Sequence, residues 1–224
     1  MADKKVPKIS DLYDLEHTIA ADLFAGKDYP WEVLDGIKEF ILALGPTLDP
    51  EEYANPAEGV WVAKDATVFP SAYLGSPCII DHGAEVRHCA FIRGSAIVGK
   101  NAVVGNSVEL KNVVLFDNVQ TPHYNYVGDS ILGYKAHMGA GSITSNVKSD
   151  KTLVVIKAEG EQIETKRKKV GAMLGDCVEV GCNSVLNPGT VIGRHSNVYP
   201  TSSVRGVVPA ESIYKGAGKI VSKN

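Results

Sequence analysis

A repeat of six residues extends over most of the chain and limits what it can fold into. Stepping by six from Val62 gives an aliphatic residue nine times in succession, as far as Leu110. Four residues after each of the first eight comes a small side chain, from Ala66 to Val108. The repeat continues, with interruptions, to Val204. A fixed period of this kind indicates stacked structural units.

The period predicts a parallel β-helix. Six residues fit neither a helix of 3.6 residues per turn nor the two-residue alternation of hairpin strands. They fit a short strand followed by a corner, and three such units make one triangular coil with its aliphatic residues inside. Neighbouring coils then stack as parallel strands and bury the aliphatic column. The 22 glycines, against 5 phenylalanines and 2 tryptophans, agree with many tight turns around small aliphatics.

The N-terminal part does not follow the period. Residues 1–59 are predicted as a helical cap, with Ser10 capping a helix that ends near Gly26. Pro30 is expected to begin a second helix, which Gly45 ends. Since the open end of a repeat protein needs a cap, the segment is expected to cover the first coil, and partner binding is the alternative.

Two further segments interrupt the repeat. Residues 115–126 are predicted as a loop between coils, and residues 147–173 as an excursion containing a β-hairpin with a basic end. The β-helix is expected to span residues 60–208. Residues 209–224 are expected to form a C-terminal tail.

Charge and composition make several classes of partner poor candidates. The net charge is −3, from 23 basic and 26 acidic residues, so neither nucleic acid nor an anionic membrane is expected as a partner. The N-terminus has no apolar run resembling a secretory signal, and the longest apolar stretch, Phe40 to Leu44, is far shorter than the roughly 20 residues that cross a bilayer. The four cysteines form no C-x-x-C pair, so a cytoplasmic location is expected.

Several motifs resemble one family of hexapeptide-repeat proteins. VELKNVVLFDNVQTPHYNYVGDSILG, from Val108, and MGAGSITSN, at 138–146, are similar to the C-terminal domain of bifunctional sugar-1-phosphate nucleotidyltransferase/acetyltransferases. The excursion ending in KRKKVGAMLGD, and NPGTVIG at 187–193, are most similar to the thymidylyltransferase-like branch. The resemblance extends from Ile92 to Val204. It implies a left-handed coil, which spacing alone does not determine.

The resemblance also implies an activity. It points to an acyltransferase that uses acetyl-CoA as co-substrate and acylates the amine of an amino-sugar phosphate, with glucosamine 1-phosphate as the first candidate. His123 would be the general base, since an imidazole with a pKa near 6.5 accepts a proton at neutral pH. Tyr126 would orient the substrate, and Asn146 would hold the acceptor. This chemistry requires no metal.

Other matched positions would bind the acceptor. Arg93 and Lys111 fall where the family clamps the sugar phosphate, a role that suits a guanidinium and an ammonium group. Lys151, or Lys148, lies near the position of a family lysine, and the insertion leaves open which of the two aligns with it. His137 stands where the family has an asparagine, so it either replaces that hydrogen-bonding group or is only a corner side chain.

The coenzyme would lie beside a different set of residues. Ala140 and the backbone at Cys182 fall where the family contacts the acetyl thioester, and an N–H near Cys182 would stabilise the oxyanion of the tetrahedral intermediate. Lys215 is a candidate for the coenzyme phosphates. Because the family packs three β-helices side by side, a homotrimer is expected.

Two alternatives remain open. The chain could be a non-catalytic β-helix subunit that binds a separate nucleotidyltransferase through its helical cap. The histidine at 137 and the added helices favour this hypothesis, as does the lack of a Gly-rich phosphate loop in residues 1–59, which leaves no pyrophosphorylase site expected. The joint presence of His123, Tyr126 and Asn146 favours an enzyme. The other alternative keeps the enzyme and changes the acceptor to a nucleotide-linked amino sugar or another amine.

Overall fold

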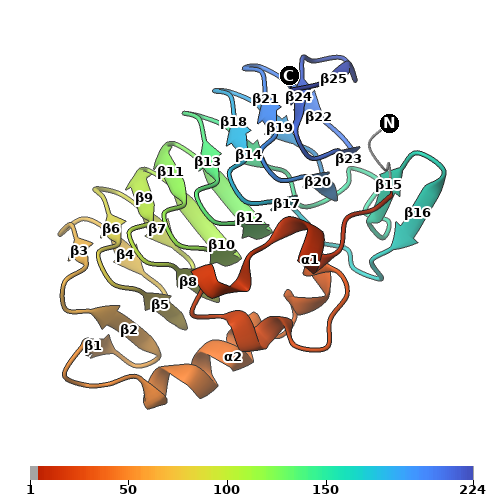
Figure 1. The fold of residues 1–224 in the computed structure, drawn as a ribbon. Helices are drawn as coiled ribbons and strands as arrows, with labels where there is room; N and C mark the ends of the chain where they lie inside the picture. The colour runs from red at the N-terminus through yellow and green to blue at the C-terminus, as the bar shows by residue number, and fades with distance from the viewer. Residues whose placement is uncertain (1–4, 224) are drawn as a thin grey trace.

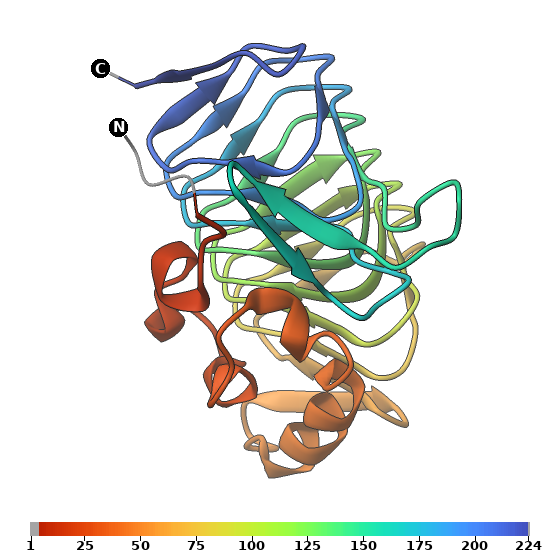
Figure 2. The same ribbon diagram turned by 90° about the vertical axis from the view of Figure 1, so that its right-hand side faces the viewer.

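Short parallel strands wound into a triangular coil form most of the molecule (Figure 1). The computed structural model describes residues 5–223. Nearly all strands pair in parallel with the strand one coil further along, so the coils stack into three faces. The chain winds in a left-handed sense (Figure 2). The expected left-handed parallel β-helix is therefore confirmed.

We number the three faces in the order in which the chain enters them. The first face contains β2 (Val60–Ala63), β5 (Cys78–Ile80), β8 (Ala96–Val98), β17 (Ala172–Leu174), β20 (Thr190–Ile192) and β23 (Val207–Val208). The second contains β3 (Thr67–Val68), β6 (Glu85–Val86), β9 (Val103–Asn106), β11 (Gln120–His123), β13 (His137–Met138), β18 (Glu179–Val180), β21 (Asn197–Val198) and β24 (Ser212–Tyr214). The third contains β4 (Tyr73–Leu74), β7 (Phe91–Ile92), β14 (Ile143–Thr144), β19 (Val185–Leu186) and β22 (Ser203–Val204). Two longer strands, β10 (Glu109–Leu115) and β12 (Tyr126–Leu132), continue from the third face into the first.

The hexapeptide pattern explains both the core and the corners. Inward aliphatic residues such as Ile92 and Leu110 are fully buried. Corner residues take a positive φ, for example 54° at Asn101, just before the buried Ala102. Asparagine tolerates this left-handed region better than most residues, and the small alanine leaves room for the chain to turn.

Two successive coils have 17 residues instead of the usual 18, which accounts for the slip in the repeat. Leu110 lies beside Val127, a step of 17 residues, whereas Val86 lies beside Val104, a step of 18. Because one corner residue is missing, β10 and β12 run through the corner without a break. The loop predicted for residues 115–126 was wrong: this segment is an ordinary coil that contains β11, paired with β9 and β13.

The N-terminal segment is built from short helices. These are α1 (Ile9–Leu12), η1 (Leu15–His17), η2 (Ala21–Phe24), η3 (Pro30–Val33), α2 (Ile37–Leu44) and η4 (Gly45–Thr47). Pro30 is the first residue of η3, and Gly45 follows the last residue of α2. The single helix expected between them is divided in two, because residues 34–36 form a turn. The long helix capped by Ser10 was wrong, because Ser10 lies inside α1, which ends at Leu12. No helix within residues 5–223 is long and apolar enough to span a membrane.

Tertiary contacts explain why the first helix stops early. The ring of Tyr13 packs 5.1 Å from that of Phe116, and the backbone N–H of Asp14 donates to Asp176 at 2.8 Å. These contacts require an extended chain at Tyr13, whose φ is −130°. A continuous helix would carry the Tyr13 side chain away from the β-helix.

The segment lies along the first face (Figure 2). The expected cover over the open end of the first coil was wrong, because the inward residues there, Val62, Val68 and Leu74, are only half-buried. The segment hydrogen-bonds to the β-helix at both Asp117 and Asp176, through His17 and Leu12. The N-terminal segment covers the outward-pointing residues of the first face, so these side chains are fully buried. These residues are Ile79, Ile97, Val114, Ile131, Met173 and Val191.

Antiparallel strands close both ends of the coil. At one end β1 (Tyr53–Ala57) pairs with β2, and at the other β25 (Ile220–Ser222) pairs with β24. Both pairings satisfy strand edges that would otherwise be exposed. Residues 209–224, expected as a tail, thus include one more strand of the second face and its covering strand.

The predicted hairpin is present in the insertion. Strands β15 (Val155–Ala158) and β16 (Glu161–Glu164) pair antiparallel around Glu159 and Gly160. Ile156 is buried, and the N–H of Val6 donates to Glu161 at 2.7 Å, so the hairpin lies beside the N-terminal segment. The chain then returns to the β-helix through the basic run Lys166–Lys169.

Candidate functional site

Three polar residues stack at the corner between the third and first faces. Asn112, Asp129 and Asn146 occupy the same position in successive coils, with φ of 55° at Asn112 and 49° at Asp129. Asp129 is 2% exposed, and both asparagine amides donate to it: Asn112 Nδ2 at 3.0 Å and Asn146 Nδ2 at 2.6 Å. We call these three residues the corner ladder. It exists because both coils here have 17 residues, so the same corner recurs at that interval.

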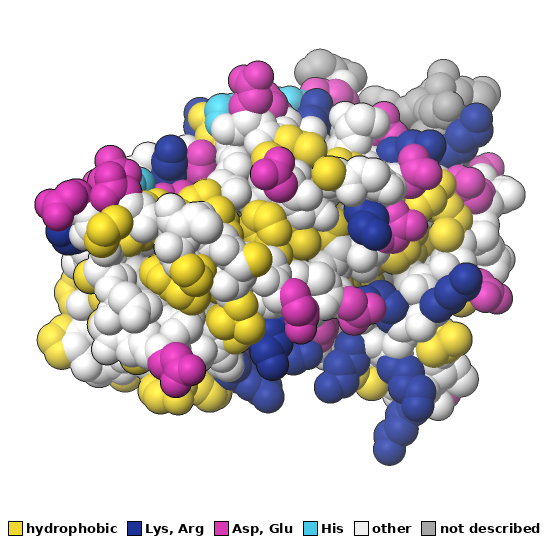
Figure 3. All heavy atoms as spheres, turned by 90° about the horizontal axis from the view of Figure 1, so that it is seen from below, with side chains coloured by type: hydrophobic (Ala, Val, Ile, Leu, Met, Phe, Trp, Pro, Cys, Tyr) yellow, Lys and Arg dark blue, Asp and Glu magenta, His cyan; other side chains and the backbone are white. Residues whose placement is uncertain are grey.

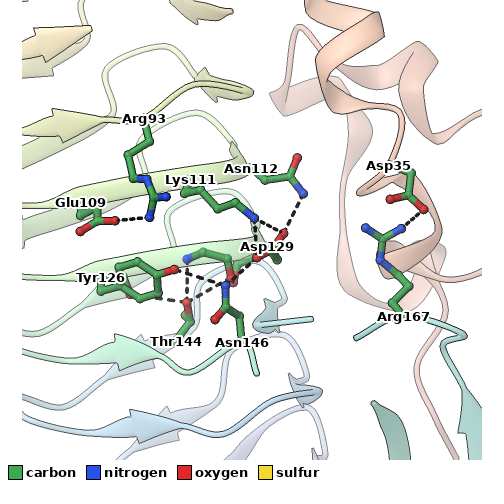
Figure 4. Close-up of polar contacts among 12 residues, drawn as sticks. Asp35, Arg93, Glu109, Lys111, Asn112, Tyr126, Asp129, Thr144, Asn146 and Arg167 are labelled. Carbon is green, nitrogen blue, oxygen red and sulfur yellow. Dashed lines mark hydrogen bonds and ion pairs between the residues drawn. The ribbon is translucent and has the colours of Figure 1, made fainter. Parts of the chain in front are cut away.

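Lys111 and Tyr126 join the ladder from the third face (Figure 4). Lys111 Nζ lies 2.9 and 3.0 Å from the two carboxylate oxygens of Asp129. The hydroxyl of Tyr126 accepts a hydrogen bond from Asn146 Nδ2 at 3.2 Å. Burial, and next the negative charge of Asp129, raises the pKa of Tyr126. The Tyr126 hydroxyl therefore stays protonated at neutral pH and remains a donor for a ligand.

Arg93 lies one coil below and pairs with Glu109 at 2.9 Å. The structure thus gathers four residues predicted from the sequence, Arg93, Lys111, Tyr126 and Asn146, in one region (Figure 4). Sequence reasoning missed Asp129, which binds two of these four directly. The recurrence of Asn, Asp and Asn at an interval of 17 was the available signal, but it appears only once the coil length is known.

His123 lies at the other edge of the third face. It ends β11, and its ring is exposed and has no hydrogen-bond or ion-pair partner within residues 5–223. Its backbone is held firmly: His123 N donates to Asn125 Oδ1 at 3.2 Å, and the buried Asn125 amide donates to Gly139 and Ser142 carbonyls. His123 is therefore a free imidazole on a rigid strand end, and not the loop residue that was expected.

Ala140 and Cys182 stack above His123 at this second corner. Gly141 N donates to His123 O, Asn183 N to Ala140 O, and each contact links one coil to the next. The amide N–H groups of Ala140 and Cys182 donate to no acceptor in the described part of the chain. We call His123, Ala140 and Cys182 the histidine column. It combines a base with free N–H donors on coils about 4.8 Å apart.

The two groups lie on opposite edges of the third face. Asp129 follows His123 by six positions along one coil, and at about 3.3 Å per residue this distance is at most about 20 Å. Tyr126 lies between them. Within one chain, the corner ladder and the histidine column do not touch.

The remaining predicted residues lie outside both groups. His137 Nδ1 is 2.7 Å from Glu179 Oε2 on the second face, so His137 has a side-chain partner of its own. Lys151 is an exposed residue in the turn after β14, with its N–H bonded to Lys148 O. Lys215 Nζ lies 6.0 Å from the ring centroid of Tyr199, near the last coil.

No group of three or more His, Cys, Asp or Glu side chains in residues 5–223 is arranged to hold a metal ion.

Fold and site define a hexapeptide-repeat β-helix protein with a polar cluster on one edge of a face and an imidazole on the other. Residues 74–210 match the family described as the GMPPB C-terminal domain. This match spans more than half of the chain, which therefore belongs to that family. The resemblance seen in the motifs is confirmed.

The relatives of the chain are longer proteins. It is 33% identical over 111 residues to a protein named bifunctional protein GlmU from Methanococcus maripaludis, an alignment covering 49% of this chain and 27% of that protein. It is 32% identical over 102 residues to a bifunctional sugar-1-phosphate nucleotidylyltransferase/acetyltransferase from Sulfurisphaera tokodaii, covering 46% and 25%. The chain thus matches about a quarter of each relative's length.

Solved structures with a similar course of the chain are distant in sequence. The polySia-specific acetyltransferase NeuO is 13% identical, with a TM-score of 0.48 over 71% of this chain and 81% of that one. The acetyltransferase domain of PglB from Neisseria gonorrhoeae, in complex with acetyl coenzyme A, is 15% identical, with a TM-score of 0.30 over 68% and 52%.

Proposed function

We propose that the chain is an acyltransferase that uses acetyl-CoA and acylates the amine of an amino-sugar phosphate, with glucosamine 1-phosphate as the first acceptor to test. The observation that carries this proposal is the pair of groups that border the third face. One supplies an unpaired imidazole with free N–H donors, and the other supplies ammonium, guanidinium, hydroxyl and amide groups. The names of the relatives in Methanococcus and Sulfurisphaera support an activity on sugar phosphates.

The histidine column would perform the chemistry. An amine attacks the thioester carbonyl only when it can lose a proton, and the free imidazole of His123 accepts that proton. The carbonyl oxygen becomes an oxyanion in the tetrahedral intermediate. The N–H groups of Ala140 and Cys182 are free to donate to it, so they stabilise the intermediate more than the ground state. The thiolate of CoA then leaves and takes up a proton. The N–H of Ala140 lies one coil from the imidazole and that of Cys182 two coils away, so a thioester lying along the column would face all three groups.

The corner ladder would hold the acceptor. Asp129 holds both Lys111 and Asn146, so these side chains are positioned before the substrate arrives. Their loss of conformational entropy then occurs on folding and does not weaken substrate binding. Tyr126 Oη, with its raised pKa, can donate to a sugar oxygen. The positive charges of Arg93 and Lys111 suit a phosphate group. His137 and Lys151 are proposed as further residues that bind the acceptor. Lys215 is proposed for the coenzyme phosphates.

The separation of the two groups favours a site completed by a second copy of the chain. The third face is not covered by the N-terminal segment, and its outward residues Tyr73 and Phe91 are 61% and 43% exposed. Packing of two copies through this region would bring the column of one copy toward the ladder of another. A homotrimer is the assembly we propose, and sedimentation as a monomer at enzyme-assay concentrations would contradict it.

Acetyl-CoA titration followed by glucosamine 1-phosphate tests the function. Heat of binding on adding acetyl-CoA, and heat of turnover on adding the sugar, are the expected results. Binding without turnover would point to another acceptor, such as a nucleotide-linked amino sugar. No coenzyme binding would overturn the proposal and favour a non-catalytic subunit that binds a separate nucleotidyltransferase.

A matched pair of histidine variants tests the assignment of the base. His123→Asn removes the imidazole at a corner where the neighbouring coil already has Asn106. His195→Asn makes the same change at an exposed corner, with φ 57°, that asparagine also tolerates. We expect acetylation by the His123 variant to fall about 10²- to 10⁴-fold, the usual contribution of a general base. The His195 variant should stay close to wild type, and equal rates in both variants would remove His123 from the mechanism.

A further inference from the structure

A cavity of about 450 Å³ lies where the insertion, the N-terminal segment and the corner ladder meet. Its walls are Leu34 and Asp35 from the N-terminal segment, Lys111, Asn112 and Asp129 from the corner, and the basic run Lys166–Lys169. Seen from this side, Lys and Arg side chains gather along one edge of the molecule (Figure 3). The volume falls within the roughly 300–1,000 Å³ typical of small-molecule sites.

The cations in this cavity outnumber the anions. Five basic side chains line it, against the two carboxylates of Asp35 and Asp129. Both carboxylates are already paired, Asp35 with Arg167 and Asp129 with Lys111. The other three ammonium groups, on Lys166, Lys168 and Lys169, have no ion-pair or hydrogen-bond partner in residues 5–223. The cavity therefore carries three uncompensated positive charges.

The backbone of the basic run is fixed at both ends. Val154 N donates to Arg167 O at 2.8 Å, and Val170 N donates to Asn146 O at 3.0 Å, which ties the run to the corner ladder. The Arg167 side chain is only 14% exposed because it reaches Asp35 on the N-terminal segment. The three free ammonium groups thus project from a rigid segment, which lowers the ordering cost of binding.

We propose that this cavity binds two linked phosphate groups, as in a pyrophosphate moiety. A single phosphate monoester carries about −1.5 to −2 charges at pH 7, which the three uncompensated ammonium groups exceed. Two linked phosphates match that charge, and ammonium groups on flexible stems suit their spread of oxygens. The moiety belongs to a nucleotide or to the coenzyme. The inference does not depend on the acyl transfer proposed above, because it rests on charge and cavity alone.

Titration calorimetry with inorganic pyrophosphate at constant ionic strength tests the proposal. The test variant, Lys166→Gln with Lys168→Gln and Lys169→Gln, removes the three free charges. The control, Lys38→Gln with Lys64→Gln and Lys219→Gln, removes three exposed lysine charges elsewhere and keeps the net charge equal. We expect the test variant to weaken pyrophosphate binding at least tenfold and the control to change it less than twofold. The single variant Lys168→Gln should weaken pyrophosphate binding twofold to fivefold, and it keeps the proposal testable if the triple variant misfolds.

Competition then identifies the source of the phosphates. Displacement of pyrophosphate by uridine diphosphate, but not by coenzyme A, supports the proposal with a nucleotide as ligand, and the reverse supports it with the coenzyme. Orthophosphate binding as tightly as pyrophosphate would overturn the assignment to two linked phosphates. No pyrophosphate binding, or equal weakening in test and control variants, would show that the run is only a solvated basic surface.

Discussion

The ammonium group of Lys111 lies 2.9 and 3.0 Å from the two carboxylate oxygens of Asp129. The carboxylate is nearly inaccessible to solvent, whereas the lysine side chain is 26% exposed. Asn112 and Asn146 complete the shell of donors around the same carboxylate. One buried charge therefore organises side chains from three successive coils. Three of these residues, Lys111, Asn112 and Asp129, also line the basic cavity.

Asp129→Asn should destabilise the protein because it removes the charge that three donors share. We expect the free energy of unfolding to fall by about 1–3 kcal/mol, since Lys111 can partly return to water while the amide donors lose an acceptor. Urea denaturation measures the change. Asp28→Asn, at an exposed pair with Lys8, should cost much less, because solvent screens the pair. A loss of similar size in both variants would mean that Asp129 has no special structural role.

Asp117→Asn should change stability in a pH-dependent way. Burial raises the pKa of Asp117, although Lys100 N donates to it at 2.8 Å. The pKa of this carboxyl is therefore higher in the folded state than its unfolded value near 3.9. At pH values between the two, the native state binds more protons than the unfolded state, so the free energy of unfolding falls as the pH rises through this range. The asparagine variant does not titrate and lacks this loss. Its free energy of unfolding, relative to that of wild type, should therefore be more favourable at pH 7 than at pH 4. Urea denaturation at both pH values gives the comparison, and a pH-independent difference would contradict the expectation.

Tyr13→Phe should stabilise the protein. The Tyr13 hydroxyl is buried and has no hydrogen-bond partner within the described chain. Burial raises the pKa of this phenol, so the group stays neutral and still lacks a partner. Removing it should raise the free energy of unfolding by about 1 kcal/mol.

The larger change Tyr13→Ala should cost about 3–5 kcal/mol, because it also removes the ring packed against Phe24 and Phe116. Tyr124→Phe, at a ring that is 64% exposed, is the control and should have little effect. A clear loss of stability in Tyr13→Phe would reveal a partner for the hydroxyl.

Gly128→Ala should impair the proposed acceptor site more than the fold. A Cβ at this position would lie 2.5 Å from Tyr126 Oη and 3.0 Å from Asn146 Nδ2, so it would crowd both side chains. Asn146 is held by Asp129, so the Tyr126 ring must give way and its hydrogen bond to Asn146 would be lost. We expect acetylation of the acceptor to fall to the level of Tyr126→Phe, with KM for acetyl-CoA unchanged. Wild-type kinetics in Gly128→Ala would show that the alignment of Tyr126 and Asn146 is not needed.

The repeat alone was enough to predict the β-helix. Each hexapeptide places one aliphatic residue inside and one small residue after a corner, as at Val98 and Ala102, and each coil contacts only its neighbours. The break in the period at residues 147–173 indicated an insertion, and two strand-like runs around Glu159 and Gly160 predicted its hairpin. The site residues Arg93, Lys111, Tyr126 and Asn146 came from motif resemblance, and the structure places them together.

The path of the N-terminal segment and the corner ladder were decided only by tertiary structure. The N–H of Asp14 finds its acceptor 162 residues away, at Asp176, and a contact at that distance leaves no periodic signal in the sequence. It overrides the local preference for a longer helix at Ser10. The ladder around Asp129 depends on two coils being one residue short, since only then do Asn112 and Asn146 stack against it. Periodic local packing can be predicted from sequence, whereas contacts between distant segments form only in the folded chain.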